Sequence, residues 1–200
     1  MTKYLVFVQG LCEDGVQWVS SSELADTLGL TSSTVRQDLS HLDFSGTTKR
    51  GYETAGLGQV LVKALGVDEE WRMVVAGAGN LGRALVMHHE FERRGFRICA
   101  IFDNDKRKIG TQVGALTVQG MRELPSVVQQ HGVQLGVLAV PPAAAQSVAD
   151  IMIASRVRGL LNLALTHIVT PRHVSVVDAR LAASLLELSY AVKTMGAIAP

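Results

Sequence analysis

Cysteine is scarce in this sequence. The chain of 200 residues has two cysteines, Cys12 and Cys99, and neither belongs to a C-x-x-C pair or a Cys/His cluster. This excludes a disulfide scaffold, and we expect no metal site. We expect both thiols to be reduced and to lie in the core.

Aromatic residues, net charge and long apolar runs are also scarce. Aromatic residues make up 5% of the chain and its formal net charge is +1, so charge indicates no particular partner. The most apolar C-terminal stretch, residues 181–200, is interrupted by Glu187 and Lys193, and no signal-like segment opens the chain. We therefore expect a soluble cytoplasmic protein with no membrane contact.

The sequence does show a change of pattern near residues 66–71. Before that point, apolar residues recur with helical spacing. After it, short Val/Ile/Leu runs alternate with longer helical stretches, which is the rhythm of βαβ units. The pattern predicts a small helical domain followed by a larger α/β domain.

The first part of the chain predicts a helix-turn-helix. A helix over residues 23–28 is followed by a turn at Gly29-Leu30 and by a second helix, which Thr31 or Ser32 caps and which runs to about Leu42. Its outer face is short and polar, and carries Ser33, Arg36, Gln37 and Ser40.

Residues 46–52 predict the β-hairpin wing of a winged helix. Lys49 and Arg50 lie between glycines and suit contacts with phosphates, whereas Arg36 would reach a guanine edge if its helix entered the major groove. The candidate DNA contacts are Ser32, Ser33, Arg36, Gln37, Lys49, Arg50 and Tyr52.

The charge of this part gives DNA binding little support. Residues 1–66 contain five Lys and Arg residues and seven Asp and Glu residues. DNA affinity would then depend on where the cations lie and would be sensitive to salt. As an alternative to DNA binding, the whole domain is only a structural helical cap. As an alternative to a base contact, Arg36 forms a surface ion pair with Asp38 or Glu23. As an alternative to a DNA contact, Tyr52 only packs the wing onto its domain.

The second part predicts a doubly wound Rossmann domain. Strands are expected over residues 73–76, 98–102, 135–140, 159–165 and 174–177. Helices are expected from the glycine loop to about 94, over 143–154 and from about 179 to 195. The predicted fold class is therefore α/β, with an N-terminal winged helix-turn-helix, a Rossmann domain and a C-terminal helix.

A G-x-G-x-x-G motif, Gly77, Gly79 and Gly82, joins the first of these strands to its helix. About twenty residues later, Asp103 ends the next strand, where a carboxylate accepts ribose hydroxyls. A carboxylate there favours NAD(H) over NADP(H), although Lys106, Arg107 and Lys108 lie nearby. Alternatively, the glycines only shape a turn, Asp103 caps a loop and the three cations are a solvated turn.

Several motifs resemble the Rex family of bacterial redox-sensing transcriptional repressors. In the first part they are Val19-Ser20-Ser21-Ser22-Glu23-Leu24, Ser33-Thr34-Val35-Arg36-Gln37-Asp38 and Lys49-Arg50-Gly51-Tyr52. In the second part they are residues 77–85, Phe102-Asp103-Asn104-Asp105 with Lys108-Ile109-Gly110, Val140-Pro141 with residues 144–146, and Gly159-Leu160-Leu161-Asn162.

The resemblance implies a homodimer that binds double-stranded operator DNA, releases it when NADH binds and retains it with NAD⁺. It implies domains at 1–66 for DNA, 67–178 for NAD(H) and 179–200 for dimerisation. The last helix would be exchanged between subunits, although its apolar spacing, Leu181, Leu185, Leu188 and Val192, equally fits packing on its own domain. The implied cofactor contacts are Gly77, Ala78, Gly79, Asn80, Leu81, Gly82, Asp103, Val140, Pro141 and Asn162.

The chain departs from the family near the expected nicotinamide position and at its start. Leu163 and Leu165 replace an aromatic residue and a proline, His88 replaces a tyrosine and Arg180 an aspartate, which puts the discrimination between NADH and NAD⁺ in question. The segment before the first family motif is also shorter than usual.

Two functions from other classes remain open at this point. We expect no enzyme, because no catalytic constellation surrounds the histidines and little chain is left for a substrate domain. The alternatives are a CoA- or nucleotide-binding Rossmann protein without DNA-binding function, which the glycine loop and Val140-Pro141-Pro142 would also suit, and a regulator that has lost DNA binding.

Overall fold

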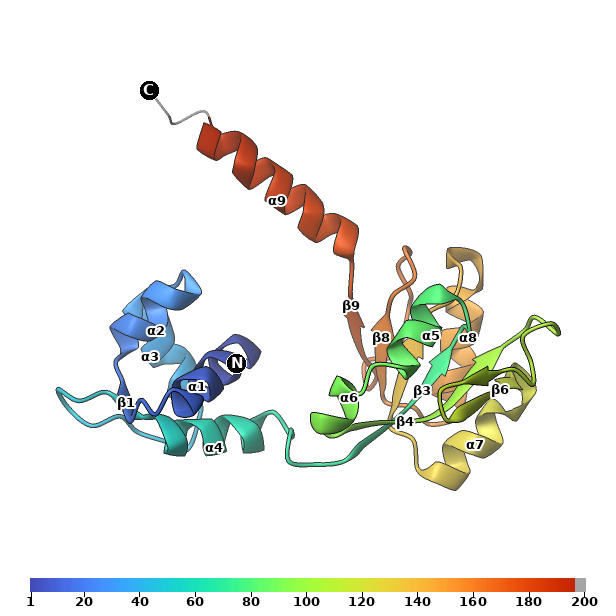
Figure 1. Ribbon diagram of the computed structural model, residues 1–200, viewed down its shortest axis with the longest axis horizontal. Coiled ribbons are helices and arrows are strands. Elements are labelled where there is room, and N and C mark those ends of the chain that lie inside the picture. Colours follow the sequence, from blue (N-terminus) through green and yellow to red (C-terminus); the bar gives the residue numbers. More distant parts are fainter. Residues whose placement is uncertain (197–200) are drawn as a thin grey trace. The chain divides into compact units, whose positions relative to one another are not determined.

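A computed structural model describes residues 1–196, with the side chains of 181, 195 and 196 excepted. Residues 197–200, at the end of the predicted 179–200 segment, lie outside the described residues. The chain divides into two units, Met1–Glu69 and Glu70–Pro200 (Figure 1).

The first unit packs helices around one apolar core. Tyr4, Leu24, Val35 and Leu57 come from four different helices and are each at most 2% exposed. The elements are α1 (Thr2–Glu13), β1 (Trp18–Val19), α2 (Ser21–Leu28), α3 (Ser32–Leu39), β2 (Tyr52–Glu53) and α4 (Thr54–Ala64).

Local hydrogen bonds set the ends of the two helices of the helix-turn-helix. Ser20 and Glu23 form a capping box at the start of α2, and Thr31 caps α3. Helix α3 ends at Leu39 and not near 42. There the hydroxyl of Ser40 donates to the carbonyl of Gln37, and such bonds compete with the helix.

Cys12 is exposed, so the expectation of a core thiol there was wrong.

The second unit confirms the doubly wound arrangement. Its sheet order is β5-β6-β4-β3-β7-β8-β9, parallel except for β5, so the chain reverses direction across the sheet between β3 and β7. The strands are β3 (Trp71–Ala76), β4 (Phe96–Asp103), β5 (Gln112–Val113), β6 (Leu116–Gly120), β7 (Leu135–Leu138), β8 (Gly159–Asn162) and β9 (Ser175–Asp178). The helices are α5 (Asn80–Val86), α6 (Glu90–Arg93), η1 (Met121–Glu123), α7 (Leu124–His131), α8 (Pro142–Ala154) and α9 (Leu181–Gly196).

Alternate residues of β3 belong to two separate cores. Val74 and Ala76 pack in the core that contains the apolar faces of α7 and α8, whereas Met73 and Val75 pack in the core that contains Leu85 of α5. This is the two-sided burial expected of a central parallel strand, and it explains the unbroken apolar run from Met73 to Ala76.

The second unit also differs from the sequence prediction. The predicted strand at 159–165 ends at Asn162, the strand at 135–140 ends at Leu138, and the helix expected to reach about Arg94 is split into α5 and α6. The break follows Met87, where the backbone N–H of Glu90 points to Nδ1 of His88 at 3.4 Å.

Helix α9 exposes its apolar side chains. Every described side chain from 182 to 193 is exposed, and Leu185, Leu188 and Val192, at helical spacing, are 65%, 59% and 62% exposed. Packing of this stripe on its own domain is therefore absent from the structure; the side chain of Leu181 lies outside the described residues. Within the part of the chain that the structure describes, no helix has the length and apolarity to cross a membrane.

Candidate dinucleotide site and DNA-binding face

The glycine loop after β3 combines two steric requirements with one open position. A Cβ on Gly77, whose φ is +103°, would lie 2.2 Å from the carbonyl oxygen of Ala139, and a Cβ on Gly82 would lie 1.9 Å from that of Gly77. A Cβ on Gly79 would meet nothing within 4 Å. The fold therefore requires glycine at 77 and 82, whereas Gly79 leaves free space that a bound ligand would use.

That space belongs to a cavity of about 480 Å³ beside the loops that follow β3, β4 and β7. The N-terminal residues of α5 and α8 form part of its wall, and such helix ends offer unpaired N–H groups to phosphates. Seven candidates line it: Gly77, Gly79, Asn80, Leu81, Asp103, Val140 and Pro141. So do six residues that were not candidates: Asn104, Lys108, Met121, Ala139, Ala144 and Val148.

Three candidates do not line the cavity. Ala78, in the loop, and Gly82, in α5, are both buried and are not among the residues that line the cavity. Asn162 is fully buried at the end of β8, where its amide nitrogen donates to the carbonyl of Thr166 at 2.8 Å and to Asp178 Oδ1 at 2.7 Å. Its side-chain oxygen accepts the N–H of Ala164 at 3.1 Å. Asn162 therefore fixes the turn after β8 and joins it to the end of β9.

Replacing Asn162 with alanine tests this structural role. We expect a loss of about 3 kcal/mol of folding free energy, because buried partners lose their hydrogen bonds. The affinity of the folded protein for NADH should change less than about threefold, and Thr166→Ala, which keeps the carbonyl that Asn162 contacts, is the control. A stable Asn162→Ala protein with much weaker NADH binding would instead return Asn162 to the ligand site. Thermal unfolding and NADH titration measure the two effects.

Asp103 is held in place by three donors. Its Oδ2 accepts the N–H of Ala78 at 2.8 Å and Nζ of Lys108 at 3.0 Å, and its Oδ1 accepts the N–H of Asp105 at 2.8 Å. Burial raises the pKa of this carboxyl, but the hydrogen bonds and the charge of Lys108 outweigh burial and hold the pKa below its usual range. Asp103 is therefore ionised at neutral pH.

The four residues that depart from the family lie outside the cavity. Leu163 is half-buried in the core on the α5 side and Leu165 is 70% exposed. The His88 ring packs against Phe91 with centroids 5.3 Å apart, and Arg180 pairs with Asp178 at 3.1 Å. None of these four residues therefore belongs to the lining of the cavity beside Gly79.

Helix α3 presents the polar face that the sequence predicts. Ser33, Arg36 and Gln37 are exposed, whereas Ser32 is half-buried and its hydroxyl lies 3.3 Å from that of Ser22. The guanidinium of Arg36 donates to the hydroxyl of Ser21 at 3.1 Å. It forms no ion pair with any described residue, so the alternative pairing with Asp38 or Glu23 was wrong.

The wing is a tight turn with two exposed cations. The backbones of Thr47 and Gly51 pair in an isolated antiparallel β-bridge, and Lys49 at the tip of the turn has a φ of +65°. The guanidinium of Arg50 lies over the ring of Trp18, 4.7 Å from its centroid, a contact that the sequence did not indicate. Tyr52 is half-buried against the core, so it packs the wing onto the domain.

Acidic residues of the first unit are engaged in internal contacts. Asp38 accepts the hydroxyl of buried Tyr4 at 2.7 Å, and burial followed by this contact raises the pKa of Tyr4 well above its usual value. Glu23 accepts the N–H of Ser20 at 2.7 Å, and Glu53 accepts the N–H of Gly56 at the same distance. Three acidic side chains of this unit therefore accept hydrogen bonds from within it.

A helix-turn-helix unit joined to a Rossmann unit with an open glycine loop defines a ligand-responsive transcription regulator. Comparisons with known families agree with this division. The family described as "Putative DNA-binding protein N-terminus" matches residues 1–40, and the family described as "CoA binding domain" matches residues 68–166.

Similarity to characterised proteins extends over both units. The redox-sensing transcriptional repressor Rex of Desulforamulus reducens is 40% identical over 95% of this chain and 91% of its own length, and Rex 1 of Thermotoga maritima is 38% identical over 96% and 92%. Among solved structures, RSP, a Rex-family repressor, has a TM-score of 0.90 at 28% identity. The match covers 98% of this chain and 91% of the RSP chain. RSP has also been solved with NADH and with NAD⁺ and operator DNA, each with a TM-score of 0.89.

The chain belongs to the Rex family of redox-sensing transcriptional repressors, which are not enzymes. The alternative of a CoA- or nucleotide-binding Rossmann protein without DNA-binding function fails because the CoA-binding match covers the second unit alone, whereas the Rex repressors match both units.

Proposed function

We propose that this chain is a homodimeric cytoplasmic repressor that binds operator DNA through α3 and the wing and releases it when NADH occupies the cavity beside Gly79. The free space at Gly79 is the observation that carries the proposal, because a Cβ at that position would meet no other protein atom within 4 Å. The binding of NADH, NAD⁺ and operator DNA by RSP supports the same reading.

The residues around the cavity fit a dinucleotide. Its pyrophosphate would lie against the backbone of Gly79 and Asn80, and its adenine ribose against Asp103. The nicotinamide would extend past this cavity toward the second subunit. The oxidised and reduced nicotinamide rings differ in charge. A ligand shifts the equilibrium between two dimer arrangements only if it binds one of them more tightly than the other. Groups near the nicotinamide ring must therefore favour one dimer arrangement when NADH is bound and the other when NAD⁺ is bound.

The exposed stripe on α9 supports the homodimer. Apolar helix faces of this kind are usually covered by protein, and we propose that a second copy of the chain covers Leu185, Leu188 and Val192. The DNA face would then be present twice, as an operator with two-fold symmetry requires.

Fluorescence anisotropy with a labelled palindromic DNA that carries a Rex-type operator tests this function. Binding is measured at low salt with no ligand, with NAD⁺ and with NADH, and a scrambled DNA is the control. We expect specific binding that NADH abolishes and NAD⁺ preserves. Equal binding with all three would exclude redox sensing. No binding, with NADH still raising the melting temperature, would leave a nucleotide-binding dimer without a DNA function.

Arg36→Ala and Arg50→Ala should weaken operator binding in different ways. We expect Arg36→Ala to lower operator affinity about tenfold to a hundredfold and to reduce the preference over scrambled DNA, because a base contact is lost. Arg50→Ala should weaken both DNAs alike and reduce the salt dependence, as loss of a phosphate contact does. Lys63→Ala on α4 is the charge-matched control. A uniform effect of Arg36→Ala on both DNAs would show that α3 does not read bases.

A further inference from the structure

The carboxylate of Asp103 has little capacity left for a ligand. A carboxylate offers about four acceptor positions, two on each oxygen. On Oδ2, the N–H of Ala78 and the ammonium of Lys108 occupy both. On Oδ1, the N–H of Asp105 occupies one. Asp103 can therefore accept one further strong hydrogen bond, on Oδ1.

An adenine ribose brings two neighbouring hydroxyls to this position. In the usual arrangement the acidic residue after the second strand accepts them. Here Asp103 has room to accept only one of the two hydroxyls. The second hydroxyl therefore needs another partner, or it must displace a donor that Asp103 already binds. Displacing the N–H of Ala78 would leave a loop amide without its acceptor.

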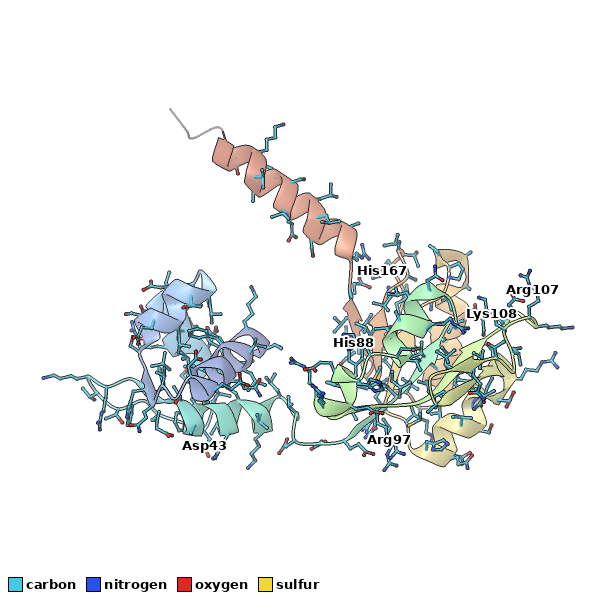
Figure 2. All side chains as sticks on the ribbon, viewed as in Figure 1. Asp43, His88, Arg97, Arg107, Lys108 and His167 are labelled. Atoms are coloured by element: carbon cyan, nitrogen blue, oxygen red, sulfur yellow. The ribbon has the colours of Figure 1, made fainter. Side chains whose placement is uncertain are left out.

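Lys108 lies where that second partner is needed. Its side chain lines the same cavity, is 38% exposed and uses one of its three donor positions on Asp103. The other two cations of this run do not line the cavity. Arg107, labelled beside Lys108 in Figure 2, is 90% exposed, and its guanidinium forms a two-point contact with Asp105 at 3.0 and 2.8 Å. Lys106 is exposed. Of this run of three cations, Lys108 alone lines the cavity.

We infer that Lys108 is the second ribose-binding group of this site. Its ammonium stays on Asp103 Oδ2 and donates to one ribose hydroxyl, while Asp103 Oδ1 accepts the other. The positive charge also offsets that of Asp103, which would otherwise repel the dinucleotide's phosphates. This inference rests on the proposed function, because it concerns the ribose of NAD(H) in the same cavity.

The test compares Lys108→Met with Arg107→Met, a matched change at the next position. Calorimetry measures the binding of NADH and of two NADH analogues whose adenine ribose lacks the 2′- or the 3′-hydroxyl. We expect Lys108→Met to weaken NADH binding about tenfold, as loss of a charge-assisted hydrogen bond does, and Arg107→Met to change it less than twofold. For one analogue, Lys108→Met should cost about threefold or less, because the hydroxyl that Lys108 binds is already missing.

Equal losses for NADH and both analogues would overturn the inference, since Lys108 would then act only through its charge or through Asp103. Unchanged NADH binding by Lys108→Met would overturn it as well. Lys108→Arg retains a donor and should keep the dependence on both hydroxyls, which checks that the methionine variant reports a lost contact and not a distorted loop. Failure of the unaltered chain to bind NADH would overturn the proposed function itself and is recognised before any variant is made.

Discussion

Gly82→Ala is expected to lower the free energy of unfolding by about 3 kcal/mol, or the midpoint of thermal unfolding by roughly 10 °C, because its Cβ would collide with the Gly77 carbonyl. Gly79→Ala should cost less than about 1 kcal/mol, since its Cβ meets no protein atom. Its effect should fall on the ligand instead: NADH affinity should drop at least about a hundredfold, because the methyl group occupies the path of the pyrophosphate.

Differential scanning calorimetry and NADH titration separate the two effects, and each glycine variant is the control for the other. A Gly79→Ala protein that binds NADH normally would show that the pyrophosphate does not approach the backbone there. A Gly79→Ala protein as unstable as Gly82→Ala would show that the loop is packed differently from the structure.

Two glutamates on α9, Leu185→Glu with Leu188→Glu, are expected to convert the dimer to a monomer. Burying two carboxylates in an apolar interface is strongly unfavourable. Operator affinity should then fall at least about a hundredfold, because the two half-sites are no longer bound by one particle. Sedimentation velocity measures the mass and anisotropy the DNA affinity.

Ala183→Glu with Thr194→Glu is the matched control. It adds the same charge on the opposite side of the helix from Leu185 and should leave the mass unchanged. If the protein with both Leu185→Glu and Leu188→Glu stays dimeric, α9 does not form the dimer interface. Its exposed apolar stripe would then bind another partner.

The sequence predicts the glycine loop well because its requirements are local. Gly77 and Gly82 are needed for contacts within a few residues or with the adjacent strand end, and Asp103 follows from the length of one βα unit. Asn104 and Ala144 also line the cavity and were within reach, since one follows Asp103 directly and the other lies in the first turn of α8. Met121 lies in a stretch without clear periodicity and gave no such signal.

Tertiary contacts decided what the sequence left open. Strands β5 and β6 and helix α7 went unpredicted, since the strands are short and partly exposed and surround a turn at Gly114. Asn162 was assigned to the ligand by resemblance alone; its three hydrogen bonds depend on where β9 and the following turn fold. The hydrogen bond from Tyr4 to Asp38 spans 34 positions, so no local pattern in the sequence indicates it.

The reversal of the sheet between β3 and β7 divides the second unit into halves that share a single hydrogen-bonded seam, four residue pairs from Met73–Leu135 to Ala76–Leu138. Gly79 and Asp103 lie in one half, whereas Val140 and Pro141 follow β7 in the other, and that other half runs through β8 and β9 directly into α9. A molecule that filled the cavity would contact residues on both sides of this seam. Such a molecule would therefore contact the half of the sheet that leads into α9.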